Sequence, residues 1–243
     1  MGKPLAAVYG VVAYAMFLAT FRYAIGFVAD RWVPIGIDSG VEGPGLDALL
    51  IVALLLGVFA VQHSVMARPG FKAWWTRLVP KPVERSTCVL PSNLALALLY
   101  WGWQPLLAPV WGVKGEAALL ALGTRCGLGW LTVLVSTVLI DLFDLLGLRQ
   151  VYLDPRGVEY RFLEFRTLFR YRLVRHPIML GLIIAFWATP DLSVGHLLCA
   201  PATGGYILIA LQLEERDLVT YYGEKATAYQ KEVPVILPLP RKR

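Results

Sequence analysis

Apolar residues dominate this chain in long runs that short polar segments separate. Four runs, at residues 5–29, 46–66, 89–109 and 117–146, each reach the length of a membrane span. A helix needs about 20 apolar residues to cross about 30 Å of hydrocarbon. Each run therefore predicts a transmembrane helix.

A fifth apolar region, at 177–213, is too long for a single span. The segment "ATPDLSVG", from Ala188 to Gly195, interrupts it with a proline and an aspartate. Proline breaks a helix, and a charged side chain is costly in hydrocarbon. The region therefore predicts two helices that fold back as a hairpin.

The five regions together predict an all-α, polytopic transmembrane helical bundle with about five membrane segments. The last of these segments is the broken hairpin. We expect the chain to form a single integral membrane domain over residues 1–243, with a four-helix N-terminal part at 1–146 and a C-terminal part at 147–243. The composition agrees, because 57% of the residues are hydrophobic and only 16% are charged, against about a quarter in soluble domains.

The basic residues predict the orientation of the helices, since cytoplasmic loops carry an excess of Lys and Arg. Segments 67–87, 147–175 and 214–243 hold 5, 7 and 6 of them, whereas the opposite loops hold only Arg31 and Lys114. Both termini are therefore expected in the cytoplasm, with the chain in a bacterial inner membrane. This topology and an anionic inner leaflet account for the net charge of +6, so no nucleic-acid partner is needed.

Cysteine and glycine positions exclude several classes of site. Cys88, Cys126 and Cys199 are odd in number and contain no Cys-x-x-Cys, which argues against a disulfide framework or a metal site. Gly127-x-Gly129 lies inside an apolar run with no strand before it, so a dinucleotide fold is not expected. The spacing of Gly123 and Gly127 indicates close helix packing.

Polar side chains gather where the predicted spans meet the cytoplasm. They are Gln62 and His63, Asp141 and Asp144, Arg175 and His176, and Glu214 and Glu215. The two aspartates are three residues apart and share one helical face, an arrangement that favours a cation. The outer half of the membrane carries almost no titratable group, whereas a transporter lines a path across the midplane. The pattern favours an enzyme that draws a charged reagent from the cytosol and an apolar one from the lipid.

Two of these clusters resemble a known family over about residues 147–235. Arg175-His176-Pro177-x-Met179-x-Gly181, then a hairpin, then Glu214-Glu215 is similar to the C-terminal half of the membrane methyltransferases that include isoprenylcysteine carboxyl and phospholipid methyltransferases. In that family these segments hold S-adenosylmethionine. The resemblance implies a cofactor-binding set of Arg175, His176, Pro177, Met179, Gly181, Glu214 and Glu215. The chemistry agrees, because this reagent carries two cationic groups and a carboxylate.

A narrower resemblance covers most of the chain. Many relatives have Tyr where Met179 stands, and Met179 together with "QHSVMARPGFKAWW" from Gln62 and "VERSTCVLPSN" from Val83 resembles the bacterial methanethiol S-methyltransferases, which make dimethyl sulfide. This implies an S-adenosylmethionine-dependent thiol S-methyltransferase that transfers a methyl group directly to methanethiol in a membrane-embedded pocket. The resemblance also implies that residues 147–243 form the cofactor-binding part of the chain.

The catalytic and substrate residues are hypotheses drawn from depth and chemistry. A thiolate is the competent nucleophile, so a base is useful, and Asp141 and His63 are candidates at the right depth. Tyr100 and Trp103, with Trp101, are candidates for the wall of a small apolar substrate pocket. Interfacial aromatic residues that only anchor the helices are an equally good interpretation.

Other readings remain open. The acceptor could be a prenylcysteine or a phospholipid, which would need a wide opening to the lipid. The chain could instead be a haem-binding subunit, with His63 and His176 as ligands. The N-terminal half is also similar to a membrane family linked with denitrification. The aromatic and basic segment 147–175 predicts an arm on the inner membrane surface that acts as a lid or as an anchor.

Overall fold

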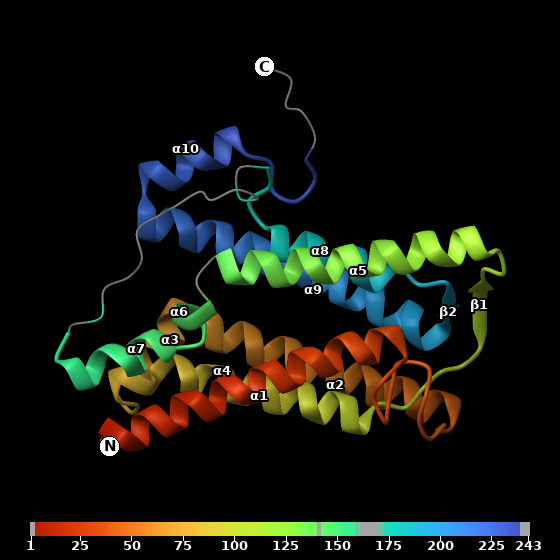
Figure 1. Ribbon diagram of the computed structural model, residues 1–243, viewed down its shortest axis with the longest axis horizontal. Helices are drawn as coiled ribbons and strands as arrows, with labels where there is room; N and C mark the ends of the chain where they lie inside the picture. Colours follow the sequence, from red (N-terminus) through yellow and green to blue (C-terminus); the bar gives the residue numbers. More distant parts are fainter. Residues whose placement is uncertain (1–2, 140–141, 159, 161–170, 172, 239–243) are drawn as a thin grey trace. The chain divides into compact units, whose positions relative to one another are not determined.

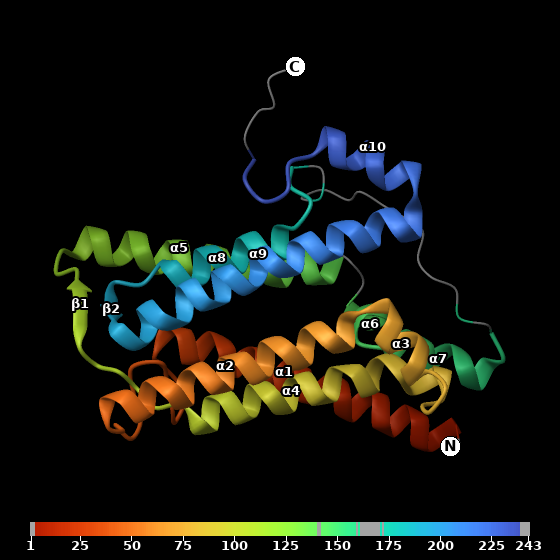
Figure 2. The same cartoon turned by 180° about the vertical axis from the view of Figure 1, so that it is seen from behind.

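The computed structural model describes residues 3–139, 142–158, 160, 171 and 173–238 (Figures 1 and 2). Within these ranges the chain is mostly helical with almost no sheet, which confirms the all-α prediction. The long helices are α1 (Lys3–Ala29), α2 (Gly45–Ala67), α4 (Glu84–Gly102), α5 (Glu116–Leu139), α8 (Pro177–Trp187) and α9 (Val194–Tyr222). The shorter elements are α3 (Pro69–Trp75), η1 (Lys81–Val83), β1 (Pro109–Gly112), α6 (Leu142–Leu145), α7 (Leu148–Leu153), η2 (Asp154–Arg156), β2 (Asp191–Ser193) and α10 (Glu224–Glu232).

Four of the described helices, α1, α2, α5 and α9, are long and apolar enough to cross a membrane. Many of their apolar side chains are exposed in the structure, as in Leu54 of α2 and Leu120 of α5. Helices with an outward apolar surface suit a hydrocarbon solvent, because all their backbone polar groups are paired internally. The chain is therefore an integral membrane protein.

The hairpin in the fifth apolar region is confirmed. Helix α8 ends at Trp187 and α9 begins at Val194, so the break falls within the predicted "ATPDLSVG" segment. Between them β2 pairs with β1 in a two-stranded sheet, an element that the apolar pattern does not reveal. With 11 residues, α8 is about 16 Å long and is too short to cross the membrane.

Two predicted spans differ from the observed helices. The third was expected at 89–109, but α4 runs from Glu84 to Gly102. A glycine followed three residues later by Pro105 is a normal helix stop, which explains the early end. The fourth was expected as one span over 117–146, but α5 and the segment that contains Asp144 belong to different compact units.

The chain folds as two compact units. Unit 1 consists of Met1–Ala108, Ile140–Phe162 and Ser193–His196, and unit 2 of Pro109–Leu139, Leu163–Leu192 and Leu197–Arg243. Unit 1 packs α1 and α2 against α4, and α1 against α7. Its core includes Phe27, whose ring lies 5.1 Å from both Tyr100 and Trp103.

Unit 2 is organised by a close contact between α5 and α8, seen in both views (Figures 1 and 2). Gly129 and Gly181 face each other there, and a Cβ atom added to Gly181 would lie 2.7 Å from the carbonyl oxygen of Gly129. Only glycine permits this approach of two backbones. Gly123 and Gly127 have no atom within 4 Å of an added Cβ, so the prediction that they form the close packing contact is wrong within the described chain.

Candidate functional site

The Arg-His-Pro step and the glutamate pair, which the family resemblance assigns to one site, lie in contact in unit 2. Arg175 and His176 stand immediately before α8, and Glu214 and Glu215 lie on α9. Glu215 receives both cations: its Oε2 lies 2.8 Å from Nη2 of Arg175, and its Oε1 lies 2.6 Å from Nε2 of His176. On its other side, Nδ1 of His176 lies 3.4 Å from Oε2 of Glu214. We call these four residues the charge cluster.

The imidazole of His176 is tuned by its two carboxylate neighbours. Burial by itself lowers the pKa of His176, but the hydrogen bonds and negative charges of Glu214 and Glu215 outweigh it and raise that pKa above its ordinary value. Both ring nitrogens face carboxylate oxygens, which is the arrangement of a donating imidazolium. It leaves neither nitrogen directed at a metal, so this geometry does not favour His176 as a haem ligand.

Exposure distinguishes the members of the charge cluster. The side chain of Arg175 is 6% exposed and that of Glu215 is 16% exposed, whereas that of Glu214 is 42% exposed. Nη1 of Arg175 also donates to the carbonyl oxygen of Gln230 at 2.7 Å. Arg175 therefore stabilises the cluster from its buried side, and Glu214 is the more exposed of the two carboxylates.

Helix α10 and the segment that follows it complete the site. The backbone N–H of Arg175 donates to the carbonyl of Pro234 (2.9 Å), and that of His176 donates to the carbonyl of Val235 (3.1 Å). Nε2 of Gln230 donates to the carbonyl of Glu215 at 3.0 Å. These bonds fix residues 233–238, which we call the C-terminal segment, beside the Arg-His-Pro step.

Tyr229 of α10 adds a further tie. Its hydroxyl donates to the carbonyl oxygen of Tyr171 at 2.5 Å, which joins α10 to the chain that leads into α8. Burial raises the pKa of Tyr229 to about 12, which favours the protonated hydroxyl that donates in this contact.

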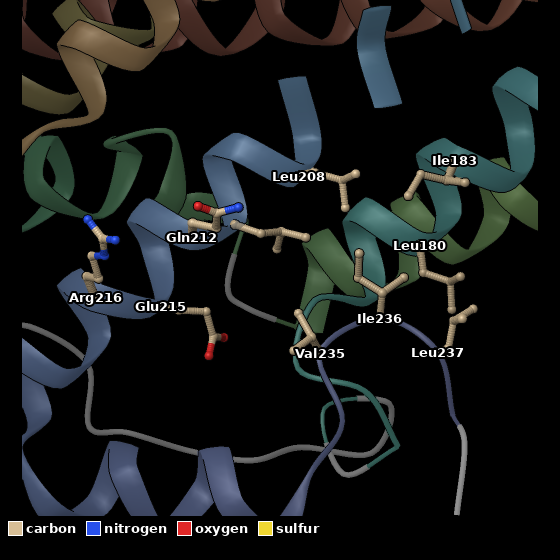
Figure 3. A pocket seen from close by; sticks show the side chains of 10 residues that line it. Leu180, Ile183, Leu208, Gln212, Glu215, Arg216, Val235, Ile236 and Leu237 are labelled. Atoms are coloured by element: carbon tan, nitrogen blue, oxygen red, sulfur yellow. The ribbon is translucent and has the colours of Figure 1, made fainter. Parts of the chain in front are cut away.

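A pocket of about 860 Å³ opens beside the charge cluster. Figure 3 shows apolar side chains from α8, α9 and the C-terminal segment around it, with the polar side chains along α9. The volume is within the range of about 300–1,000 Å³ that is usual for small-molecule sites. The lining residues are Leu180, Ile183, Leu208, Leu211, Gln212, Glu215, Arg216, Val235, Ile236 and Leu237.

Three of the residues in the implied cofactor set lie on α8 without lining this pocket. Pro177 occupies the first turn of the helix, where its missing N–H costs nothing, and Met179 is half-buried. Gly181 is buried against Gly129. Their positions indicate that they start α8 and pack it against α5. Their part in cofactor binding stays a prediction.

Of the two predicted base residues, the structure describes His63, which belongs to unit 1. His63 is exposed on α2, with Nδ1 3.2 Å from the hydroxyl of Ser92 and its ring stacked on Phe59. Asp141 lies outside the described residues. Asp144, its predicted neighbour on one helical face, is buried and contacts Arg85 and Arg149. The role of His63 and Asp141 as a base stays a prediction.

The predicted substrate residues Tyr100 and Trp103 are packed in the core of unit 1. Tyr100 stacks on Tyr23 at 4.8 Å between ring centroids, and Nε1 of Trp103 donates to the carbonyl of Ile37 at 2.9 Å. Their surroundings are those of structural aromatic residues, and neither lines the pocket of unit 2.

The sequence motifs did not identify every residue of the site. Gln212 and Arg216 flank the glutamate pair on α9 at the spacing of one helical turn, a signal that could have been used. Gln230 and the apolar run "VPVILP" of the C-terminal segment carry no such signal, because their roles come from backbone contacts with a distant part of the chain.

Comparison with curated proteins finds relatives along the whole chain. A methanethiol S-methyltransferase of Mycobacterium tuberculosis is 51% identical over 242 residues, which cover 100% of this chain and 99% of the relative. A methanethiol S-methyltransferase of Crocosphaera subtropica is 48% identical over 238 residues, covering 98% and 93%.

A Nurim homolog of Drosophila pseudoobscura pseudoobscura is more distant, at 32% identity over 182 residues that cover 72% of this chain and 68% of the relative. No family model matches, and no solved structure matches significantly. The full-length similarity agrees with the narrower resemblance predicted from Met179 and the N-terminal motifs. The chain belongs to the family of the methanethiol S-methyltransferases.

Proposed function

We propose that this chain is an S-adenosylmethionine-dependent methyltransferase that converts methanethiol to dimethyl sulfide. The observation that carries the proposal is that Glu215 of the charge cluster lines a pocket together with Gln212 and Arg216, while the rest of the lining is aliphatic. The reaction needs a charged methyl donor and a small apolar acceptor together. The names of the full-length relatives support the same chemistry.

The residues present fit the charged end of S-adenosylmethionine. Glu214 is the accessible carboxylate for its ammonium group, and Arg216 lines the pocket as a guanidinium for its carboxylate. Gln212 adds an amide that can donate and accept hydrogen bonds. When bound, this reagent supplies an electrophilic methyl group on a sulfonium.

The buried members of the cluster act by positioning. Arg175 and His176 hold both oxygens of Glu215, so this carboxylate cannot rotate, and Gln230 fixes the backbone at the same residue. A rigid cluster aligns the two reactants and lowers the entropic part of the barrier. The aliphatic wall of the pocket excludes water from the reacting sulfur.

The proposal includes an orientation. Segments 67–87, 147–175 and 214–243 are basic, so we place the charge cluster at the cytoplasmic surface of a bacterial inner membrane with both termini inside. Single cysteines introduced at Lys225 and at Lys114 test this, with native cysteines replaced. Only the residue at position 114 is expected to react with a membrane-impermeant thiol reagent added outside intact cells.

Binding of the methyl donor to purified protein tests the proposed cofactor site. Glu214→Gln removes one charge from the accessible side of the cluster and is expected to weaken binding of S-adenosylmethionine by about tenfold to a hundredfold, the usual range for a hydrogen bond to a charged group. Glu224→Gln on the exposed part of α10 is the matched control and is expected to bind like the wild type. Equal affinity in all three proteins would contradict the assignment.

The acceptor is tested by turnover with labelled S-adenosylmethionine. Methanethiol, a prenylcysteine and a phospholipid are offered separately to the same preparation. Labelled dimethyl sulfide is the expected product. Turnover of the prenylcysteine or the phospholipid alone would keep the methyl donor and overturn the acceptor.

A further inference from the structure

The pocket of unit 2 is larger than methanethiol requires. Methanethiol has two heavy atoms, whereas a volume of about 860 Å³ lies in the upper part of the range that is usual for drug-sized ligands, and the methyl donor fills part of it. The polar side chains that suit the methyl donor lie on α9 at Gln212, Glu215 and Arg216 (Figure 3). The remainder of the lining is free to take an acceptor of greater length.

That remainder is uniformly aliphatic. Leu180 and Ile183 come from α8, Leu208 and Leu211 from α9, and Ile236 from the C-terminal segment. None of these side chains carries a hydrogen-bonding group, so an acceptor can be recognised there only through its apolar surface and its size. An apolar wall is a weak filter against additional methylenes, because each one changes the binding free energy by only about 1–3 kcal/mol.

We infer that this aliphatic part of the pocket is the acceptor site, and that the enzyme accepts unbranched alkyl thiols of two to four carbons as well as methanethiol. The inference rests on the proposed function. In each case a bond forms between the thiolate sulfur and the methyl carbon. The bond from that carbon to the sulfonium sulfur breaks, its electron pair stays on S-adenosylhomocysteine, and the thiol proton passes to water. The product is an alkyl methyl sulfide.

A series of thiols tests the inference with the intact purified protein. Ethanethiol, 1-propanethiol and 1-butanethiol are compared with methanethiol, and the sulfides are measured by gas chromatography. Each added methylene buried in the pocket is expected to lower KM about three- to fourfold. 2-Mercaptoethanol has the same number of heavy atoms as 1-propanethiol, and its hydroxyl would lose its hydrogen bonds to water in the aliphatic wall. Its KM is expected to be at least tenfold higher.

Two neighbouring residues of α9 provide a matched pair of variants. Leu208 lines the pocket and Ile209 does not, although the two are similarly exposed, at 55% and 61%. Leu208→Trp is expected to raise KM for 1-butanethiol at least tenfold, with a smaller effect on methanethiol and unchanged affinity for S-adenosylmethionine. Ile209→Trp is expected to leave all three values unchanged.

The outcomes separate the two proposals. Absence of turnover with every thiol, methanethiol included, would overturn the proposed function. Turnover of methanethiol without turnover of longer thiols would overturn only the wider acceptor class. Equal effects of Leu208→Trp and Ile209→Trp would overturn the location of the acceptor site.

Discussion

Among the described residues, each unit contains a partly buried cluster of charged side chains, and the two clusters differ in what surrounds them. In unit 1 the carboxylate of Asp144 contacts Arg85 at 2.5 Å and Arg149 at 3.3 Å, and it accepts a hydrogen bond from Tyr160 at 3.2 Å. Both guanidinium groups also lie over the ring of Tyr160. In unit 2 two carboxylates meet two cations, and one of the carboxylates lines a pocket.

The difference separates a structural ion cluster from a candidate binding site. Arg85 donates to the backbone carbonyl of Asp144 as well as to its side chain, so the contacts of Asp144 tie α4 to α6. In the charge cluster, by contrast, Glu214 is 42% exposed and Glu215 borders open volume. Burial and pairing are common to both, and an adjoining cavity with an accessible carboxylate is the feature that indicates ligand binding.

Removing the central carboxylate of each cluster gives the largest expected effects. Glu215→Gln leaves Arg175 buried without its ionic partner, and a broken buried pair costs about 3–5 kcal/mol of unfolding free energy. It is also expected to abolish measurable binding of S-adenosylmethionine. Asp144→Asn is expected to destabilise the protein by a similar amount while the folded fraction keeps its affinity.

Thermal unfolding in detergent and calorimetric titration measure the two quantities separately. The distinction between a structural and a ligand-binding cluster is wrong if, in folded samples, Asp144→Asn weakens binding of S-adenosylmethionine as much as Glu215→Gln does. That result would assign the cluster of unit 1 to the site as well.

The next largest effect is expected from a substitution at the contact between Gly129 and Gly181 in unit 2. In Gly181→Ala the new Cβ would lie 2.7 Å from the carbonyl of Gly129, so α5 and α8 must separate, at a cost of about 1–3 kcal/mol. Because the Arg-His-Pro step leads into α8, the affinity for the methyl donor is expected to fall as well. Gly123→Ala, on the same helix as Gly129 but with open space around it, is the control and is expected to be neutral or slightly stabilising. Equal destabilisation by both changes would contradict the close contact.

The smallest expected effect is the pH dependence of the stability that His176 contributes. The folded-state pKa of His176 lies above its unfolded value of about 6.5, so the stability contributed by the imidazolium is fully present below that value. It is lost as the pH rises through the folded-state pKa. The difference in melting temperature between wild type and His176→Gln should therefore be greater at pH 6 than at pH 9. A difference that grows with pH would show that the neutral imidazole is the stabilising form.

Much of this fold could be predicted from the sequence, since the hydrophobic pattern alone locates the long helices. Pro190 and Asp191 inside an apolar run reveal the hairpin, because both are unfavourable in a continuous membrane helix. The charge cluster could be predicted too. Its members are ionisable residues at the ends of apolar runs, where function is the first hypothesis, and the resemblance to the membrane methyltransferases pairs the Arg-His-Pro step with Glu214 and Glu215.

Other features depend on contacts that no local pattern encodes. Arg85 and Asp144 are 59 positions apart, and nothing in the sequence near Asp144 distinguishes a structural partner from a catalytic one. Tyr100 and Trp103 have the composition of a substrate pocket, but the aromatic rings around them belong to the core. The pocket wall at Ile236 is an ordinary apolar residue that acquires its role from the hydrogen bonds of its neighbours.

The C-terminal segment has a consequence for the order in which the protein matures. Gln230, whose carbonyl receives the buried guanidinium of Arg175, is translated 55 positions after it. The Arg-His-Pro step is therefore synthesised, and α8 and α9 follow it towards the membrane, before the chain that completes the pocket has left the ribosome. Capacity to bind the methyl donor should thus arise as a final event after insertion, when α10 docks. A ribosome-bound intermediate that lacks residues 230–238 would have α8 and α9 but no binding site.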